Sequence, residues 1–374
     1  MNQPQNHTPR RPSAQHNEPP VQHGTYSDGT GTCLTYRKRR AAPLTGALLC
    51  ALVFFLVILV CILVISQSRQ PQSPAPATDS LPVSAAALPE STPSPQPSDI
   101  PHDTVTLPAS AVAEGNLILV NAGHPYVFPQ SQPQTVLYGN KSPVYVLSNA
   151  SISLNTSLFP IFDGMLVDFS RESGCKEVLV TSGYRSYEFQ EELYDSRVKS
   201  QGAEQAALYV ALPGNSEHHA GLAVDMVIYK DGRQYYFPDY EDAAWLIEHA
   251  PDYGFILRYT EDKQSVTQCA PEPWHYRYVG TPHARLITAL GFCFEEYHEY
   301  LHQFTWEGTR LLTDGEGNAA DADADAALPT DGYMIYYVPA APSGGDTDIP
   351  VPVGSEYEIS GDNAGGFIVT VTLR

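Results

Sequence analysis

Apolar and polar positions along the chain follow patterns that predict both strands and helices. Strand-like segments are LILVNAGHPY from residue 117, SPVYVLSNASISLN, KEVLVTSGYR, LAVDMVIY and EPWHYRYVG. Helical spacing of apolar residues occurs in SLFPIFDGMLVDFSRES, YEFQEELYDSRVKSQGAEQA, DAAWLIEHAPDYG and ARLITALGFCFEEYHEYLHQF. Strands and helices are mixed without regular βαβ alternation, so the pattern predicts an α+β fold rather than a doubly wound α/β fold.

One apolar run is far longer than a core strand. Residues 44–65 comprise 22 residues without a charge or a proline. A helix rises 1.5 Å per residue, so this run spans a hydrocarbon core of roughly 30 Å. The core of a cleaved signal peptide has only about 7–15 residues. We therefore expect a retained transmembrane helix over residues 44–66.

The charges around this run predict its orientation. Residues 1–43 hold six basic and two acidic residues, a net charge of +4, with Arg37-Lys38-Arg39-Arg40 just before the apolar run. No comparable basic block follows it. The positive-inside rule thus predicts a single-pass protein of the plasma membrane, with the N-terminus in the cytoplasm and the rest outside.

The remaining composition predicts how the chain is divided. Residues 1–43 are polar and are expected to form a disordered cytoplasmic tail, and residues 67–104 form a stalk rich in proline and serine. A globular domain is expected over residues 105–305. Residues 306–374 then form an acidic linker and a small β appendage. The whole chain carries a net charge of −21, which argues against nucleic acid as a partner because phosphate requires the opposite sign.

Two segments carry the residues from which a metal site could be built. His218 lies in a loop within PGNSEHHAGLAVDM, and Asp225 follows in the predicted strand LAVDMVIY. Strand alternation places Leu222, Val224 and Met226 on the core face and Asp225 on the other face. A histidine from the loop and a carboxylate from the strand can then meet.

The second segment, EPWHYRYVG, follows about fifty residues later. His275 faces away from its alternating aromatic row, and Glu272 stands at the entry to the strand. Two histidines and one carboxylate suit a catalytic zinc site, which leaves a fourth position for water. Glu272 is placed to act as the general base. Arg185 in TSGYRS is the candidate cation for the oxyanion.

Three motifs together carry a family resemblance: SGYRS, S-x-H-x-x-G-x-A-x-D and E-P-W-H. In this order and spacing the chain resembles the VanY-type D-alanyl-D-alanine carboxypeptidases, a zinc peptidase family that includes VanX-like dipeptidases. The likeness covers about residues 115–300 and implies an antiparallel sheet flanked by helices. It leaves the residues after 306 without an implied role.

The resemblance also implies roles for individual residues. His218, Asp225 and His275 would bind zinc, Glu272 would be the general base, and Arg185 would stabilise the oxyanion. Ser216 and Gln190 would contact the terminal residue of the substrate, although Gln190 has the alternative of a plain solvated helix position. The partner implied is a peptidoglycan stem peptide that ends in D-Ala.

A second metal motif occurs in the closing helix. Residues 298–302, His-Glu-Tyr-Leu-His, spell H-E-x-x-H, the signature of zincins. Such short matches arise by chance, and no third ligand follows, because Glu307 is too close and Glu316 lies in the linker. We therefore interpret this motif as an exposed face of the helix.

The function predicted is removal of terminal D-alanine from peptidoglycan stems by a membrane-anchored zinc D,D-carboxypeptidase. Three alternatives stay open. The same site could act as an L,D-carboxypeptidase or an endopeptidase, because pocket shape rather than motif decides the bond cleaved. The domain could be a non-catalytic peptidoglycan-binding module. The chain could be a surface adhesin that works through its C-terminal appendage.

Overall fold

The computed structural model describes residues 23–27, 33–37, 100–322 and 331–374. The chain divides into two units, residues 1–91 and 92–374. In the first unit the described residues pair as an antiparallel hairpin of β1 (His23–Ser27) and β2 (Cys33–Arg37). The hairpin differs from the structureless tail expected for these residues. The threonine, tyrosine and leucine residues of HGTYS and CLTYR favour strands, which gives the physical reason.

The expected transmembrane helix over residues 44–66 and the stalk up to residue 99 lie outside the described residues. The membrane anchor therefore stays a prediction. Among the helices of the described part of the chain, none has the length and apolar character needed to cross a membrane.

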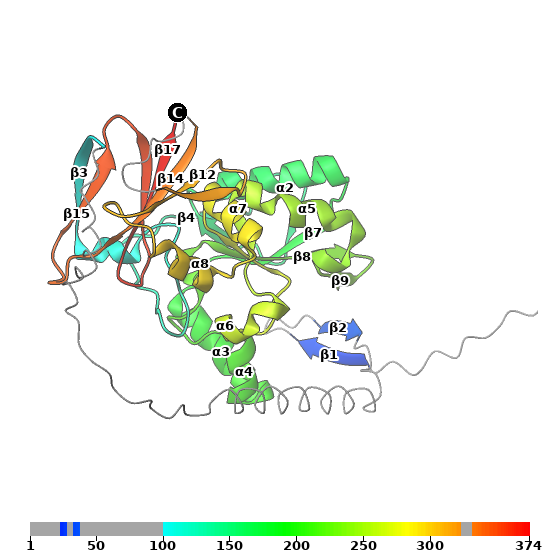
Figure 1. The fold of residues 1–374 in the computed structure, drawn as a ribbon. Helices are drawn as coiled ribbons and strands as arrows, with labels where there is room; N and C mark the ends of the chain where they lie inside the picture. Colours follow the sequence, from blue (N-terminus) through cyan, green and yellow to red (C-terminus); the bar gives the residue numbers. More distant parts are fainter. Residues whose placement is uncertain (1–22, 28–32, 38–99, 323–330) are drawn as a thin grey trace, which may run out of the picture. The chain divides into compact units, whose positions relative to one another are not determined.

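A mixed sheet forms the centre of the second unit (Figure 1). Its strands run in the order β10-β11-β8-β7-β5, and β9 pairs with β8. All of these pairs are antiparallel except β5 with β7. The bounds are β5 Val146–Leu147, β7 Val178–Ser182, β8 Ala223–Lys230, β9 Arg233–Tyr235, β10 Phe255–Leu257 and β11 His275–Tyr278. A separate ladder pairs β4 (Gln134–Val136) with β6 (Ser153–Asn155). Helices and mostly antiparallel strands confirm the α+β class.

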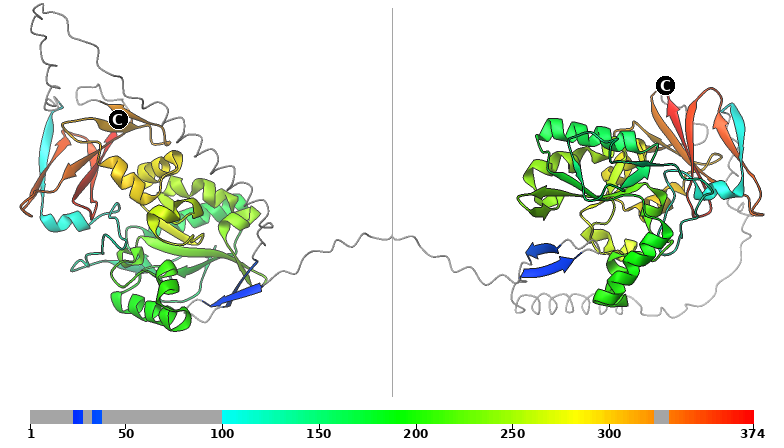
Figure 2. Two further views of the ribbon diagram at one scale, coloured as in Figure 1. Left: turned by 60° about the horizontal axis from the view of Figure 1, so that its bottom comes forward. Right: turned by 180° about the vertical axis from the view of Figure 1, so that it is seen from behind.

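Helices surround this sheet (Figures 1 and 2). They are α2 Phe159–Ser173, α3 Tyr187–Gln201, α4 Ala203–Tyr209, α5 Ala244–His249, α6 Gln264–Thr267, α7 Thr281–Leu290 and α8 Phe294–Leu301. Short 3₁₀ helices lie between them: η1 Ala109–Ala113, η2 Glu217–Ala220, η3 Phe237–Asp239, η4 Glu241–Ala243, η5 Ala250–Tyr253 and η6 Glu261–Lys263.

Local signals account for the ends of α2 and α3. Pro160 stands in the first turn of α2, where its missing N–H costs nothing, and the helix ends at Gly174, whose φ of 72° is left-handed. The Oγ of Ser186 accepts a hydrogen bond from the N–H of Phe189 and caps α3.

One face of the sheet packs on α2 and α5 and forms the main core. Met165 of α2 and Leu246 of α5 share this core with Val224 and Met226 of β8. The alternation predicted for LAVDMVIY is thus confirmed. Asp225, between the two core residues, belongs to the opposite face of the sheet.

The C-terminal residues form a second sheet, in the order β13-β12-β14-β17-β16. Its strands are β12 Arg310–Thr313, β13 Ala319–Ala322, β14 Gly332–Pro339, β16 Glu356–Gly361 and β17 Gly366–Leu373. A further ladder pairs β15 (Thr347–Pro352) with β3 (His102–Leu107). The domain boundary expected at residue 105 therefore falls inside a strand. Residues 102–107 belong with the C-terminal strands rather than with the stalk or the start of the globular domain.

The C-terminal sheet is also not a separate appendage. A buried cluster joins Phe294 and Leu301 of α8 to Leu311 of β12, Ile335 of β14 and Ile368 of β17. The two sheets are thus connected through α8 by one apolar core. Local sequence patterns could identify the strands, but they could not show that a core is shared across these distances in the chain.

Candidate active site

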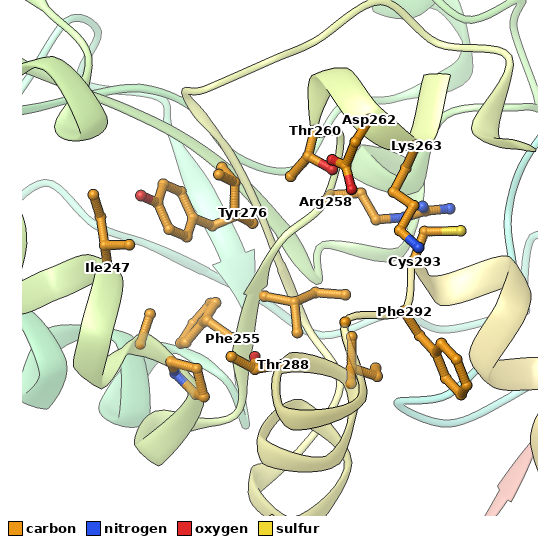
Figure 3. A pocket seen from close by; sticks show the side chains of 16 residues that line it. Ile247, Phe255, Arg258, Thr260, Asp262, Lys263, Tyr276, Thr288, Phe292 and Cys293 are labelled. Carbon is orange, nitrogen blue, oxygen red and sulfur yellow. The ribbon is translucent and has the colours of Figure 1, made fainter. Parts of the chain in front are cut away.

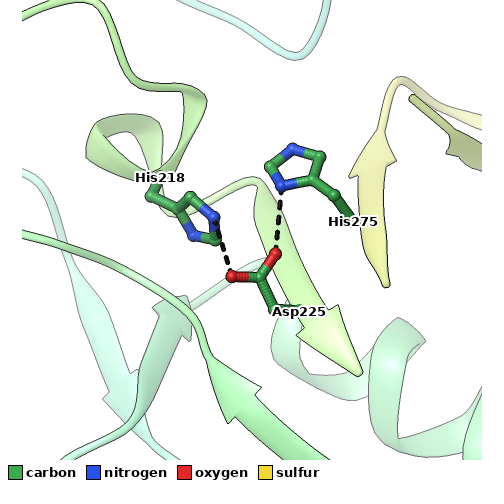
Figure 4. A group of neighbouring side chains, drawn as sticks. All are labelled: His218, Asp225 and His275. Carbon is green, nitrogen blue, oxygen red and sulfur yellow. Dashed lines mark hydrogen bonds and ion pairs between the residues drawn. The ribbon is translucent and has the colours of Figure 1, made fainter. Parts of the chain in front are cut away.

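Three side chains from separate segments meet on the face of the central sheet opposite the main core (Figure 4). His218 comes from η2, Asp225 from β8 and His275 from β11. Asp225 and His275 are directly paired across the antiparallel strands. The Nε2 of His218 lies 3.3 Å from Oδ2 of Asp225, and the Nδ1 of His275 lies 3.0 Å from Oδ1. The structure therefore brings the three expected ligands together, and all three are buried.

The other nitrogen of each histidine is held from outside the cluster. The Nδ1 of His218 lies 2.6 Å from the carbonyl oxygen of Gly183, and the Nε2 of His275 lies 3.3 Å from Oε2 of Glu217. Both partners are acceptors, so each of these ring nitrogens carries the proton. The nitrogens that face Asp225 are the ones that would turn a lone pair to a bound metal.

Glu217 is a functional residue that the sequence analysis did not identify. Its side chain is fully buried and pairs with two equally buried cations, Arg258 at 2.8 Å and Arg277 at 3.3 Å. Burial by itself would raise the pKa of Glu217, but these two guanidinium groups and His275 hold it well below its usual value. Glu217 is therefore a permanent anion that orients His275.

Glu272 lies beside the cluster, as expected. Its Oε2 is 3.7 Å from the Nδ1 of His275. Its backbone N–H donates to Tyr259 and its carbonyl accepts from the N–H of His275, so the turn before β11 fixes its position. Burial raises the pKa of Glu272 to about 8. A carboxyl group with a raised pKa next to a ligand set has the properties of a proton acceptor.

Arg185 contacts the cluster directly. Its Nη2 donates to Oδ2 of Asp225 at 2.7 Å, and its Nε donates to Ser182 at 2.9 Å. The side chain remains 15% exposed, which leaves the guanidinium reachable from solvent. Arg185 thus holds a ligand in place, and its expected contact with an oxyanion stays a prediction.

The two predicted substrate contacts are both buried. The side-chain oxygen of Gln190 accepts from Nη1 of Arg185 at 3.3 Å, and its nitrogen donates to the carbonyl oxygen of Ala211. The alternative of a solvated helix position is therefore wrong for Gln190. Ser216 precedes η2 and lies next to the ligand loop. Contact of either residue with a substrate stays a prediction.

His219 has a structural task that sequence reasoning missed. Its Nε2 accepts from the N–H of Gly214, so its Nδ1 donates to the carbonyl oxygen of Arg185. The ring is completely buried. His219 therefore ties the loop that carries the ligand His218 to the loop that carries Arg185.

The residues present fit a zinc ion. Two imidazoles and one carboxylate are the donor set of catalytic zinc sites. Burial by itself would lower the pKa of His275, but hydrogen bonds to Asp225 and Glu217 raise it to about 9, so zinc binding would displace the proton from the nitrogen that faces Asp225. Burial, with the Arg185 charge, lowers the pKa of His218 to about 4, which keeps that ring neutral. Burial alone would raise the pKa of Asp225, but its histidine and arginine neighbours hold it well below the usual value.

A cavity of about 260 Å³ lies apart from this cluster (Figure 3). Apolar side chains of α5, β10 and α7 form much of its wall, and Asp262, Lys263 and Cys293 lie at its polar end. None of His218, Asp225 and His275 lines it. Arg258 reaches both the cavity and Glu217, so the cavity adjoins the ion pairs that support the site rather than the ligands.

The α+β fold and the ligand cluster define the class as a metallopeptidase. Comparison with known proteins identifies the family within this class. The family described as "VanY: D-alanyl-D-alanine carboxypeptidase" matches residues 152–281, which include every expected ligand and Glu272. A D-alanyl-D-alanine carboxypeptidase of Enterococcus faecium is 32% identical over 71% of this chain and 78% of its own length.

Two further similar proteins point to the same family. The bifunctional D-Ala-D-Ala dipeptidase and D-Ala-D-Ala carboxypeptidase VanXYC of Enterococcus gallinarum is 36% identical over 50% of this chain and 95% of its own. The structure of the vancomycin resistance D,D-dipeptidase VanXYg, in complex with a D-Ala-D-Ala phosphinate analogue, superposes with a TM-score of 0.60 and 30% identity. That alignment covers 72% of this chain and 99% of the other. The chain belongs to the VanY-type D-alanyl-D-alanine carboxypeptidase family, whose members are zinc metallopeptidases.

Proposed function

We propose that this chain is a zinc-dependent D,D-carboxypeptidase that removes the terminal D-alanine from peptidoglycan stem peptides. The observation that carries the proposal is the position of Glu272, buried and 3.7 Å from His275, beside three converging ligand side chains. A binding module without catalysis has no use for a proton acceptor at this place. Family membership supports the same reaction.

His218, Asp225 and His275 would hold the zinc ion, which in such sites lowers the pKa of water and polarises the scissile carbonyl. Glu272 would accept the proton of the attacking water and deliver it to the amino group of the leaving D-alanine. The raised pKa of Glu272 suits both halves of this transfer.

Arg185 would supply the positive charge opposite the tetrahedral oxyanion. Its bond to Asp225 already fixes the guanidinium at the edge of the ligand cluster. Gln190, which bonds to the same guanidinium, would keep it oriented. Ser216 lies two residues before His218, where it could meet the terminal residue of the substrate.

The test uses the purified full chain with zinc and a synthetic pentapeptide stem. We expect the release of one D-alanine per stem peptide, which mass spectrometry detects. Glu272→Gln keeps the shape of the side chain but removes its basicity, so we expect kcat to fall by about 10²–10⁴-fold with zinc content unchanged. Equal rates for the variant and the wild type would remove Glu272 from the mechanism.

Substrate panels separate the remaining alternatives. Cleavage of tetrapeptide or cross-linked stems, without release from the pentapeptide, would establish an L,D-carboxypeptidase or an endopeptidase with the same centre. Free D-Ala-D-Ala is included because two relatives are named as dipeptidases. Bound zinc without cleavage of any stem would favour the binding module.

We also propose that residues 44–66 anchor the chain in the plasma membrane, with the N-terminus in the cytoplasm. The support is the uncharged run of 22 residues and the basic block before it. Fractionation of cells that express the chain is expected to place it in the membrane. Protease added outside should remove the enzyme domain. Recovery of the chain in the soluble fraction would contradict the anchor.

A further inference from the structure

The H-E-x-x-H motif of α8 does not form the exposed face that the sequence suggested. His298 is only 3% exposed, and His302 follows directly after the last turn of the helix. A third residue of metal-binding type reaches them from far along the chain. It is Asp362, in the connection between β16 and β17, and one ligand atom from each of the three residues lies within 4.8 Å of the others.

Asp362 is held rigidly for such a role. Its Oδ1 accepts the backbone N–H groups of Ala364, Gly365 and Gly366 at 2.7, 2.9 and 2.9 Å. Its Oδ2 lies 3.0 Å from the Nε2 of His302. The spacing between carboxylate and imidazole therefore matches that of the cluster around Asp225, where the corresponding distances are 3.0 and 3.3 Å.

His298 supplies an independent observation. Both of its ring nitrogens are buried, and neither has a hydrogen-bond partner among the described residues. Buried polar atoms almost always have a partner, and an orphan requires an explanation such as an ion. His283, another buried histidine of this region, uses both nitrogens, with Tyr297 and Thr370. The isolation of His298 is thus not a general feature of this core.

We propose that His298, His302 and Asp362 form a second metal site, specific for a divalent ion of the zinc type. Two imidazoles and one carboxylate are nitrogen and oxygen donors that suit zinc. The site shares no residue with the His218, Asp225 and His275 cluster. It therefore does not depend on the proposed peptidase reaction.

The second site is structural rather than catalytic. Glu299, the residue that would be the base of a zincin, is exposed, whereas His298 is buried. Aromatic rings pack against the two histidines. The ring centroids of Phe294 and His298 are 4.6 Å apart, and those of Tyr337 and His302 are 4.1 Å apart. A metal here would join α8, which packs beside the catalytic sheet, to the turn of the C-terminal sheet.

Metal counting on the full chain tests the proposal. Purified protein is stripped with chelator, dialysed against zinc alone, and analysed by elemental mass spectrometry. We expect two zinc ions per chain in the wild type and one in Asp225→Ala. His302→Ala should also bind one, and the double variant none. Zinc should raise the melting temperature of Asp225→Ala and leave that of the double variant unchanged.

Asp362→Asn guards against a folding artefact, because an amide oxygen can still accept the three backbone N–H groups of the turn. It is expected to lose one zinc ion while keeping stem-peptide hydrolysis at moderate temperature. Two zinc ions in both His302→Ala and Asp362→Asn, or none in Asp225→Ala, would overturn the second site. Failure of stem hydrolysis with a count of two would instead refute only the proposed function.

Discussion

At the scale of single residues, Glu217 links zinc binding to folding. The same carboxylate accepts from the Nε2 of His275 and pairs with two fully buried guanidinium groups. Removing one partner of a buried ion pair leaves an uncompensated charge, which costs about 3–5 kcal/mol. Removing a residue that orients a ligand histidine typically weakens metal binding by about 10–100-fold.

Glu217→Gln is therefore expected to lower both the free energy of unfolding and the affinity for zinc. The free energy of unfolding, measured by urea denaturation, should fall by about 3–5 kcal/mol, because the buried Arg277 loses its anion and Arg258 keeps only Glu295. The zinc Kd, measured by competition with a chromophoric chelator, should rise by about 10–100-fold, because an amide orients His275 less strongly.

Glu295→Gln is the matched control. Glu295 also pairs with Arg258, at 2.6 Å, but does not contact His275. This variant should lose stability and keep its zinc affinity. An equal loss of zinc affinity in both variants would show that the effect comes from general loosening rather than from the orientation of His275.

Residue types and spacing were enough to predict His218, Asp225, His275 and Glu272 as one site. Each belongs to a motif in which neighbouring residues restrict its position. Glu217 belongs to the same motif but gave no separate signal, because a glutamate in a loop is usually solvated. Its importance depends on Arg258 and Arg277, which lie 41 and 60 residues further along the chain.

At the scale of elements, the end of β7 fixes the position of the loop that carries His218. Gly183 follows β7, and its carbonyl oxygen holds the Nδ1 of His218. A Cβ at Gly183 would lie 2.3 Å from the carbonyl oxygen of Ser153. No side chain fits there unless β6 or the loop moves, and such movement would displace the acceptor of His218.

Gly183→Ala is expected to destabilise the fold by about 1–3 kcal/mol through overpacking. It should also weaken zinc binding, because the carbonyl oxygen that orients His218 moves with the loop. Thermal denaturation with and without zinc measures both effects.

Gly164→Ala serves as the comparison. Gly164 lies inside α2, and nothing is within 4 Å of its added Cβ. Alanine is the better helix former, so this variant should gain about 0.5–1 kcal/mol and keep its zinc affinity. If Gly183→Ala behaved in the same way, the close approach at β6 would have no role in the site.

At the scale of the whole molecule, the C-terminal sheet is part of the enzyme's core. Leu311, Ile335 and Ile368 pack against α8, and each buried side chain of this kind contributes about 1.5–3 kcal/mol. Together they contribute roughly 5–9 kcal/mol, which is comparable with the total stability of a typical domain.

Truncation after residue 305 is therefore expected to abolish cooperative unfolding and hydrolysis together. It removes the partners of α8 and of β3. Circular dichroism melts and the soluble yield measure the outcome. Deletion of residues 1–91, a separate unit, should leave the melting transition intact. A truncated chain that melts like the full chain would return the C-terminal sheet to the status of an appendage and reopen the adhesin alternative.

The sequence by itself determined the α+β class, the four residues at the centre of the active site and the family. These depend on local periodicity and on motifs, in which each residue is constrained by near neighbours. Only the tertiary structure revealed three further features. They are the contact of Glu217 with His275, the pairing of β3 with β15, and the proximity of His298 and His302 to Asp362. In each case the partners lie between about 40 and 250 residues apart, and only folding brings such residues into contact.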